Sequence, residues 1–433
     1  MTNNTDQVPI ISVTGTKGKT TTVAVIADVL RALNHNVVKV DTTGHFVNGV
    51  RRSSLDDSKQ AWRLVPSVCP GRYLWEFHSH PELRENGVAV LECSLGCSAL
   101  SGLGYRYHQV GVFLNVFEDH LGSSNRIQSR EDIAKAKAFI FSKILPEGAA
   151  VVFNADDELV VKTLESDLLT EKNALKIAVG FDFAYIDKKS FLGSGGVTLT
   201  VNSDTQLVLE TAKGSSVLAN LKNIPWTFDG QFTPSLWNLL SAAGAIYGLY
   251  LGKMPEGFGM ALESVRLDPY GGRLTLLRAA NGALVLADYA HEKVSIEMVG
   301  NLARTKLKLG GKLYGVVRLA HDRTDTLMTE TGKSIARAYD EFIVYEKIDG
   351  YWRKPVNNAK TKRFPQVVGR TSEIFADAIA SVNPNVTRIL REDKAIAEAA
   401  MRAREGDVVV IIVNDNIECS IGFIKDSFKA EFI

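Results

Sequence analysis

Several features that mark special classes of protein are scarce in this sequence. Its four cysteines, Cys69, Cys93, Cys97 and Cys419, are too few and too scattered for a disulfide framework, and no second close pair completes a zinc site. No apolar run approaches the roughly 18–20 residues of a membrane span, and the N-terminus resembles no signal peptide. We therefore expect reduced cysteines and a cytoplasmic protein without a membrane partner.

The chain also lacks an excess of charge of either sign. Its formal net charge is +1, with 45% hydrophobic and 23% charged residues. This balance is that of ordinary globular proteins and offers no argument for a nucleic-acid partner. At 433 residues the chain exceeds the usual size of a single core, so two or three domains are expected. The composition is compatible with a homo-oligomer.

Short apolar runs alternate with helical patterns along the chain, which predicts α/β domains with parallel sheets covered on both faces. In the first half we expect strands at 8–13, 37–40, 88–91, 110–116, 150–153 and 177–179, and helices at 19–33, 130–144, 158–169 and 235–251. Alternating residues at 197–201 and 206–210 predict an appended antiparallel hairpin.

A turn-rich break at 268–272 predicts a boundary between a domain at 1–268 and a smaller Rossmann-like α/β domain at 272–433. In the second domain we expect strands at 284–287, 313–317, 342–344 and 408–413, and helices near 292–307, 325–340, 371–381 and 391–405. The fold class predicted is thus a P-loop, doubly wound parallel domain followed by a second α/β domain.

A phosphate-binding loop is indicated near the N-terminus, where a buried strand runs into a glycine-containing turn and then a helix. The backbone N–H groups of such a turn and of the helix N-terminus form a positive concave site for a phosphate chain. Lys19 would face the β- and γ-phosphates, and the Thr20 hydroxyl would reach Mg²⁺. The candidate ATP-binding residues here are Gly15, Thr16, Lys17, Gly18, Lys19, Thr20 and Thr21.

Polar residues follow the next two expected strands. Glu92 comes directly after 88–91, and the segment 115–121 (Asn-Val-Phe-Glu-Asp-His-Leu) begins with Asn115 and contains His120. Ligands sit at the carboxyl ends of strands in doubly wound sheets, and a hard divalent ion near a triphosphate requires oxygen or imidazole donors. Taken singly, Glu92 could be a solvated strand-end charge, and 119–120 a helix N-cap with a surface histidine.

These motifs, in order and spacing, resemble the central domain of the Mur ligase superfamily, and the similarity continues along the chain. The segment 232–243, containing Asn238, resembles the helix of that family that contacts adenine. Three later segments, Gly272-Arg273, 288–291 (Asp-Tyr-Ala-His) and 321–325 (His-Asp-Arg-Thr-Asp), resemble motifs of its last domain. The nearest branch is the Mur-ligase-like half of cyanophycin synthetase. We find no counterpart of the N-terminal UDP-sugar domain of murein ligases or of an ATP-grasp module.

The resemblance implies roles for individual residues. Thr20 and Glu92 would hold one Mg²⁺ and His120 a second, with Lys19 on the phosphates. Lys137 aligns with a lysine that some members carry as a carbamate bridging the second metal, although it could also be a solvated lysine like Lys135. Further nucleotide contacts are implied for Asn115, Asn238, Arg273, Asp288, His291 and Arg323.

The activity implied is that of an ATP-dependent carboxylate–amine ligase working through an acyl phosphate, with release of ADP and phosphate. Its partners would be a small-molecule or peptide carboxylate acceptor and an amino acid or amine. Two alternatives remain open: an amidating subunit that works with a glutaminase, and a non-catalytic ATP-binding scaffold. The sequence departs from relatives at Glu292-Lys293, where most have Asn-Pro or Thr-Pro, and at His321, where glycine is expected.

Overall fold

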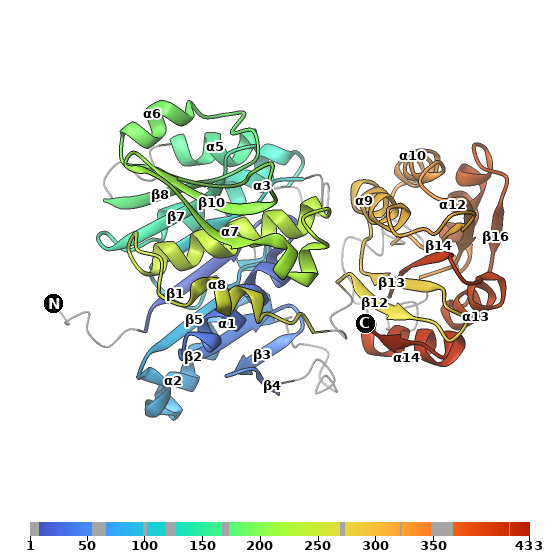
Figure 1. Ribbon diagram of the computed structural model, residues 1–433, viewed down its shortest axis with the longest axis horizontal. Helices are drawn as coiled ribbons and strands as arrows, with labels where there is room; N and C mark the ends of the chain where they lie inside the picture. Colours follow the sequence, from blue (N-terminus) through green and yellow to red (C-terminus); the bar gives the residue numbers. More distant parts are fainter. Residues whose placement is uncertain are drawn as a thin grey trace. The chain divides into compact units, whose positions relative to one another are not determined.

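The computed structural model describes residues 8–53, 66–97, 102–117, 127–166, 173–268, 273–320, 323–347, 367–414 and 416–433. The chain divides into two compact units, Met1–Leu267 (unit 1) and Asp268–Ile433 (unit 2). Each unit is built around its own sheet with helices on both faces (Figure 1). Within the described residues, no helix has the length and apolar character needed to cross a membrane.

Unit 1 contains an 11-stranded sheet in the order β11-β10-β9-β8-β7-β6-β1-β5-β2-β3-β4. Strands β1, β2 and β5 to β9 pair in parallel, whereas β2-β3-β4 and β9-β10-β11 pair antiparallel. The strands are β1 Ile10–Thr14, β2 Asn36–Asp41, β3 Gly44–Val47, β4 Val50–Ser53, β5 Gly87–Glu92, β6 Val110–Phe113, β7 Ala149–Asn154, β8 Ala174–Val179, β9 Val197–Val201, β10 Gln206–Thr211 and β11 Gly214–Asn220.

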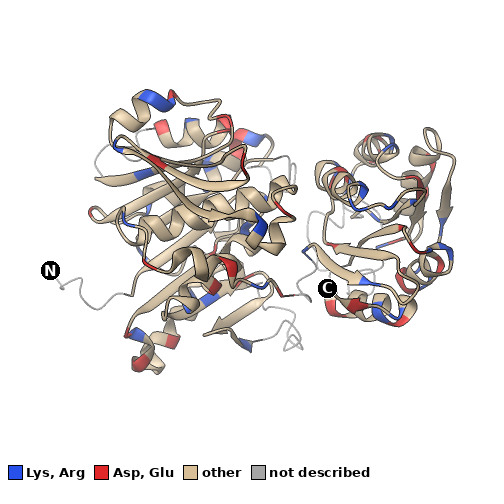
Figure 2. Cartoon of the chain, in the orientation of Figure 1, with Lys and Arg blue, Asp and Glu red and all other residues tan. Residues whose placement is uncertain are grey.

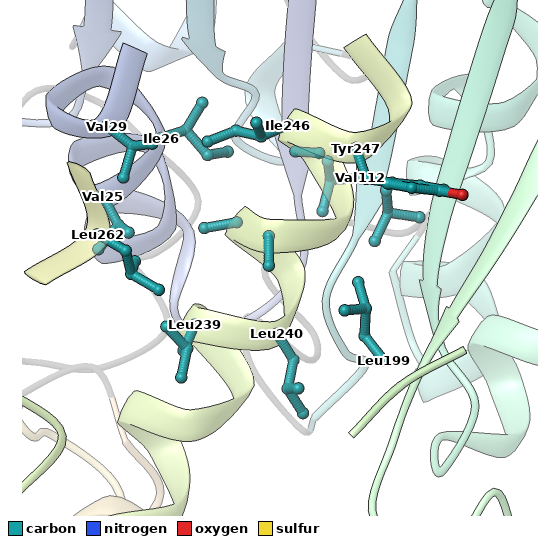
Figure 3. Close-up of a cluster of buried hydrophobic side chains, with 14 of the residues drawn as sticks. Val25, Ile26, Val29, Val112, Leu199, Leu239, Leu240, Ile246, Tyr247 and Leu262 are labelled. Carbon is teal, nitrogen blue, oxygen red and sulfur yellow. The ribbon is translucent and has the colours of Figure 1, made fainter. Parts of the chain in front are cut away.

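Two long helices, α1 Lys19–Ala32 and α7 Thr233–Leu249, pack on one face of this sheet. Figure 3 shows Ile26 of α1 next to Ile246 of α7, with Leu239 of α7 lower in the view. A methyl group on Gly248 would come within 2.7 Å of the Ala150 Cβ atom, so glycine lets α7 lie close to β7. Helices α3 Arg130–Lys137, α4 Phe139–Ser142 and α5 Glu158–Glu165 contribute to the core on the other face. Unit 1 also contains the short helices α6 Lys188–Gly193 and α8 Phe258–Glu263.

The structure corrects some expected elements of unit 1. The single helix expected at 130–144 is wrong, because α3 ends at Lys137 and α4 follows after Ala138. In α4 the Ile140 carbonyl accepts a hydrogen bond from His108 Nε2 at 2.9 Å, so a tertiary contact replaces continued helical bonding. The appended hairpin has a third strand, β11, and the hairpin β3-β4 was not expected.

Unit 2 contains a seven-stranded sheet in the order β16-β15-β14-β17-β13-β12-β18. Strands β13 to β17 are parallel, and β12 and β18 are antiparallel to their neighbours. The strands are β12 Thr275–Arg278, β13 Leu284–Asp288, β14 Leu313–Val317, β15 Glu341–Val344, β16 Val386–Arg388, β17 Val408–Ile412 and β18 Glu431–Phe432.

Helices cover both faces of this second sheet. Helices α9 Lys293–Arg304, α10 Asp325–Ile335 and α12 Arg370–Ala380 lie on one side, and α13 Glu392–Arg402 and α14 Ile417–Phe428 lie on the other (Figure 1). Strands β12, β16 and β18 and helix α14 were not expected, because the short strands carry little periodicity. The parallel α/β class predicted for the whole chain is confirmed. Acidic and basic residues are interspersed along both units (Figure 2).

Candidate active site

The predicted phosphate-binding loop connects β1 to α1. Gly18 is the N-cap of α1 and has φ +84°, a left-handed conformation that favours glycine. No side chain caps this end of the helix, and its first turn contains no acidic residue. The backbone N–H groups of the first turn therefore offer hydrogen bonds and a positive dipole end to an anion.

Asn115, which follows β6, holds the loop in shape. Its Oδ1 atom accepts hydrogen bonds from the backbone N–H groups of Thr16 (3.1 Å) and Lys17 (2.8 Å). Its Nδ2 atom donates to the Lys17 carbonyl at 3.2 Å. The backbone N–H of Phe117 donates to Thr16 Oγ1 at 3.1 Å. A strand that neighbours β1 thus sets the backbone conformation of the loop.

Two further predicted residues lie on this loop or against it. The Lys19 ammonium group donates to the Thr16 carbonyl at 2.9 Å, across the turn. The buried amide of Asn238, on α7, accepts a hydrogen bond from Thr22 Oγ1 at 3.1 Å. A methyl group on Gly18 would approach Asn238 Oδ1 to 2.4 Å. Asn238 therefore lies directly against the N-terminus of α1.

Glu92, the last residue of β5, is 1% exposed and accepts three hydrogen bonds. Thr20 Oγ1 donates to its Oε2 atom at 2.8 Å, and Thr42 donates to both oxygens, from Oγ1 to Oε1 at 2.7 Å and from the backbone N–H to Oε2 at 3.2 Å. A buried carboxylate beside two threonine hydroxyls is an oxygen donor set of the kind that Mg²⁺ prefers. The residues present fit a magnesium site.

Thr42 was missed as a candidate from the sequence. It follows β2, and the parallel pairing of β2 with β5 brings the ends of the two strands together. The available signal was the polar run Asp41-Thr42-Thr43 directly after an apolar strand, a position at which parallel sheets bind ligands.

Lys137, the last residue of α3, is buried, whereas the neighbouring Lys135 is exposed. Its Nζ atom donates to Thr14 Oγ1 at 3.4 Å, and Thr14 Oγ1 donates to the Cys93 carbonyl at 2.8 Å. Lys137 thus lies at the ends of β1 and β5 and not on a solvated helix face.

The cysteines next to this site are free thiols, as are the other two. Cys93 and Cys97 are buried, and the Cys93 sulfur lies 3.5 Å from the hydroxyl of Tyr105. That hydroxyl is 2.6 Å from Ser12 Oγ. Burial raises the pKa of Tyr105 well above its usual range, and the neighbouring Cys93 adds to the rise. Tyr105 is therefore a neutral hydrogen-bonding group at neutral pH.

Some predicted positions lie outside the described residues, namely His120, Gly272 and His321. Within the part of the chain that is described, no group of three or more His, Cys, Asp or Glu side chains is placed to hold a metal ion. The predicted site at Thr20 and Glu92 has one carboxylate only, and the second predicted metal site depends on His120.

In unit 2, three predicted residues gather around Tyr289. Asp288, at the end of β13, accepts a hydrogen bond at Oδ2 from the Leu274 backbone N–H (2.9 Å). The guanidinium carbon of Arg273 lies 5.0 Å from the centre of the Tyr289 ring. His291 Nδ1 donates to the Tyr289 carbonyl at 3.0 Å. The fourth, Arg323, directly precedes the N-cap of α10, Thr324.

Two known domain families match this chain. The Mur ligase middle domain matches residues 13–204, and the Mur ligase glutamate ligase domain matches residues 272–412. The chain belongs to the Mur ligase superfamily. Members of this superfamily are ATP-dependent ligases that join an acid to an amino acid.

Relatives with known names lie in two branches of the superfamily. Cyanophycin synthetase of Nostoc sp. is 29% identical over 427 residues, which cover 97% of this chain and 42% of that protein. UDP-N-acetylmuramoyl-L-alanyl-D-glutamate--2,6-diaminopimelate ligase of Bacteroides thetaiotaomicron is 23% identical over 412 residues, covering 94% of this chain and 74% of that protein. The chain thus spans about two fifths of the length of the cyanophycin synthetases that it matches.

Solved structures share the fold of the chain. E. coli FolC in complex with DHPP and ADP has a TM-score of 0.63 at 18% identity, covering 97% of this chain and 89% of that one. A bifunctional folylpolyglutamate synthase/dihydrofolate synthase with Mn, AMPPNP and L-glutamate bound has a TM-score of 0.60 at 17% identity, covering 98% of this chain and 90% of that one.

Proposed function

We propose that the protein is an ATP-dependent carboxylate–amine ligase that forms an amide bond through an acyl phosphate, releasing ADP and phosphate. The observation that carries the proposal is that a buried carboxylate lies next to a phosphate-binding loop whose following helix, α1, has no side-chain cap. Glu92 lies within hydrogen-bond distance of Thr20, in the first turn of α1, so both can act on one phosphate chain.

The reaction makes three demands on the residues of unit 1. The residues 15–21 bind the phosphates through their backbone N–H groups, with the loop held by Asn115. Lys19 leaves the Thr16 carbonyl and offsets the charge that grows on the transferring phosphoryl group. Thr20 and Glu92 hold Mg²⁺, which when bound neutralises phosphate charge and orients the phosphates.

A second metal position is proposed at His120, next to the acyl phosphate. Lys137 supports this position because its ammonium group is buried at the end of β1, beside Thr14. It serves there either as a carbamate or as an unmodified cation. A high-resolution map decides between the two states of Lys137.

Further nucleotide contacts are proposed for Asn238 of α7 and, within unit 2, for Arg273, Asp288, His291 and Arg323. Acid-to-amine ligation requires that water be kept from the acyl phosphate, since hydrolysis would waste ATP.

The substrates are proposed as a peptide or amino-acid-like carboxylate and an amino acid or amine. The name of one relative supports this class, because the Bacteroides enzyme is named as a ligase of UDP-N-acetylmuramoyl-L-alanyl-D-glutamate and 2,6-diaminopimelate.

The test measures ADP release by the full chain with a panel of amino acids and carboxylate acceptors. A ligase releases ADP only when both co-substrates are present, and hydroxylamine added with ATP and the acceptor alone should trap the acyl phosphate as a hydroxamate. Lys19→Ala provides the inactive control. Slow ATP hydrolysis that is indifferent to every acceptor and amine would contradict the proposal and favour a binding protein.

A further inference from the structure

Four side chains form a row across one face of the unit 2 sheet, at the carboxyl ends of its strands. The backbone pairing continues by one residue beyond the strands, since Val413 N–H donates to the Asp288 carbonyl and Tyr345 N–H donates to the Val317 carbonyl. This register places Tyr289, Val413, Arg318 and Tyr345 side by side, directly after β13, β17, β14 and β15. The row lies on the face covered by α13 and α14.

Arg318 stands in the middle of this row, and its side chain is 0% exposed. Its Nη2 atom donates to the Val413 carbonyl at 2.5 Å. Its guanidinium carbon lies 5.1 Å from the centre of the Tyr289 ring. The guanidinium thus reaches from β14 past β17 to the residue after β13.

The surroundings of Arg318 leave part of its hydrogen-bonding capacity unused. Among the described residues, its buried Nε and Nη1 atoms have no hydrogen-bond partner. The carboxylate of Glu392 lies next to Tyr345, whose hydroxyl donates to it at 3.4 Å, and it accepts hydrogen bonds from Ser420 Oγ at 2.6 Å and Asn414 Nδ2 at 2.9 Å. Burial raises the pKa of Tyr345, Glu392 adds to the rise, and Arg318 opposes it.

Stability alone gives little reason for an arginine at this position. A buried charge with unpaired N–H groups is costly, and replacing such a group by an apolar side chain of similar volume is often neutral or stabilising. What the arginine provides, and an apolar residue does not, is a cation over the Tyr289 ring and a donor to the Val413 carbonyl.

Tyr289 connects this buried cation to the candidate site. It lies between Asp288 and His291 in sequence, and its carbonyl accepts the hydrogen bond from His291 Nδ1. The guanidinium carbon of Arg273 lies 5.0 Å from the centre of the same ring. Two cations, one buried and one partly exposed, therefore hold one aromatic ring within the turn that carries the proposed nucleotide contacts.

We propose that Arg318 is a positioning residue: anchored on the Val413 carbonyl, it fixes the Tyr289 ring and thereby the 288–291 turn, with Asp288 and His291 at its ends. The catalytic part of this inference rests on the proposed ligase function. The conformational part concerns the turn alone and can be measured without any substrate.

The experiment compares Arg318→Met with Arg388→Met in the full chain. Arg388 is a matched control, because it is a unit 2 arginine that donates to the Gly369 carbonyl (2.6 Å) and Ser372 Oγ (3.1 Å), away from the row. We expect Arg318→Met to retain or raise the melting temperature while amide hydrogen exchange at 288–292 accelerates by about tenfold. Arg388→Met should lower the melting temperature and leave exchange at 288–292 unchanged.

Activity provides the second readout. With an acceptor and amine pair that supports turnover, Arg318→Met should lower kcat by about tenfold with little change in the Kd for Mg·ADP, and Arg318→Lys should recover part of the loss. If the wild-type chain ligates no pair, the ligase proposal fails, while the exchange result still decides whether Arg318 positions the turn.

A second variant covers the case in which Arg318→Met does not fold. Tyr289→Leu removes the ring from the other end of the contact and should reproduce the faster exchange at 288–292. Exchange within twofold of wild type in a folded variant would overturn the inference. A lower melting temperature with faster exchange spread over all of unit 2 would also overturn it, because Arg318 would then be a structural residue.

Discussion

In unit 1 the candidate site residues are joined to one another by hydrogen bonds, whereas in unit 2 they gather around one aromatic ring. Asn115 holds the phosphate loop through two backbone N–H groups, and Glu92 accepts hydrogen bonds from Thr20 and Thr42. In unit 2, Arg273 and Arg318 each lie over Tyr289. Hydrogen bonds are directional, but a cation over a ring is held less tightly in orientation.

This difference suggests different tasks for the two units. The phosphate-binding loop of unit 1 is already held in shape, so binding a nucleotide costs little conformational entropy. In unit 2 the two cations position the Tyr289 ring, and the turn beside it suits contacts that strengthen only as the reaction proceeds. The predictions below test whether unit 1 captures the nucleotide and unit 2 acts during the reaction. Each expected effect is given as a free energy, from the largest to the smallest.

The largest effect is expected for Lys19→Ala. Loss of a cation at the transferring phosphoryl group should lower the rate of ADP formation by about 10²–10³, or about 3–4 kcal/mol. The fold should be retained because Asn115 shapes the loop through backbone groups. Steady-state ADP release checks this, with exposed Lys253→Ala as a charge-matched control. A rate within threefold of wild type would remove the loop from the mechanism.

Mg·ADP should stabilise unit 1 selectively. At a free concentration of about 100 times Kd, the stabilisation is about 2.7 kcal/mol. Calorimetry of the full chain should show the unit 1 transition moving upward with the ligand and returning when a chelator removes Mg²⁺. Equal shifts of both transitions would contradict a nucleotide site preformed in unit 1.

Thr42→Val should weaken magnesium binding by about 10–100-fold, or about 1.4–2.7 kcal/mol, because it removes the hydroxyl that orients Glu92. Titrating Mg²⁺ against ADP formation measures the change. Thr43→Val is the control, since the Thr43 hydroxyl donates to Asp41 at 2.6 Å and not to Glu92. Identical magnesium curves for the two variants would mean that Thr42 does not orient the carboxylate.

The smallest effect is expected for Arg273→Ala, with a loss in kcat of about tenfold, or about 1.4 kcal/mol. The Kd for Mg·ADP should change by less than about threefold, since the loop of unit 1 is untouched. Arg278→Ala, at an exposed position of β12, is the matched control. A large loss of nucleotide affinity with kcat preserved would reverse the roles assigned to the two units.

Much of the fold followed from apolar periodicity. The strands at Val37–Val40, Val88–Leu91 and Leu313–Val317 agree with the structure to within about two residues. The end of α4 was not predictable, because the Ile140 carbonyl accepts a hydrogen bond from His108, a residue distant in sequence. Short edge strands such as β16 were missed because three residues carry no recognisable period.

The local chemistry of the chain was readable from the sequence alone. Glycines in the loop, Lys19 and Thr20 at the helix start, and Glu92 at a strand end are local patterns, and each reflects a backbone or charge requirement within a few residues. These patterns pointed to the phosphate loop, the α/β class and the Mur ligase superfamily.

Tertiary structure decided which distant residues serve those patterns. Only the pairing of β2 with β5 brings Thr42 to Glu92, and only the row across four strands brings Arg318 to Tyr289. Residues so far apart in the chain leave no local period to detect. Their proximity arises because parallel pairing gathers the carboxyl ends of many strands at one edge of a sheet.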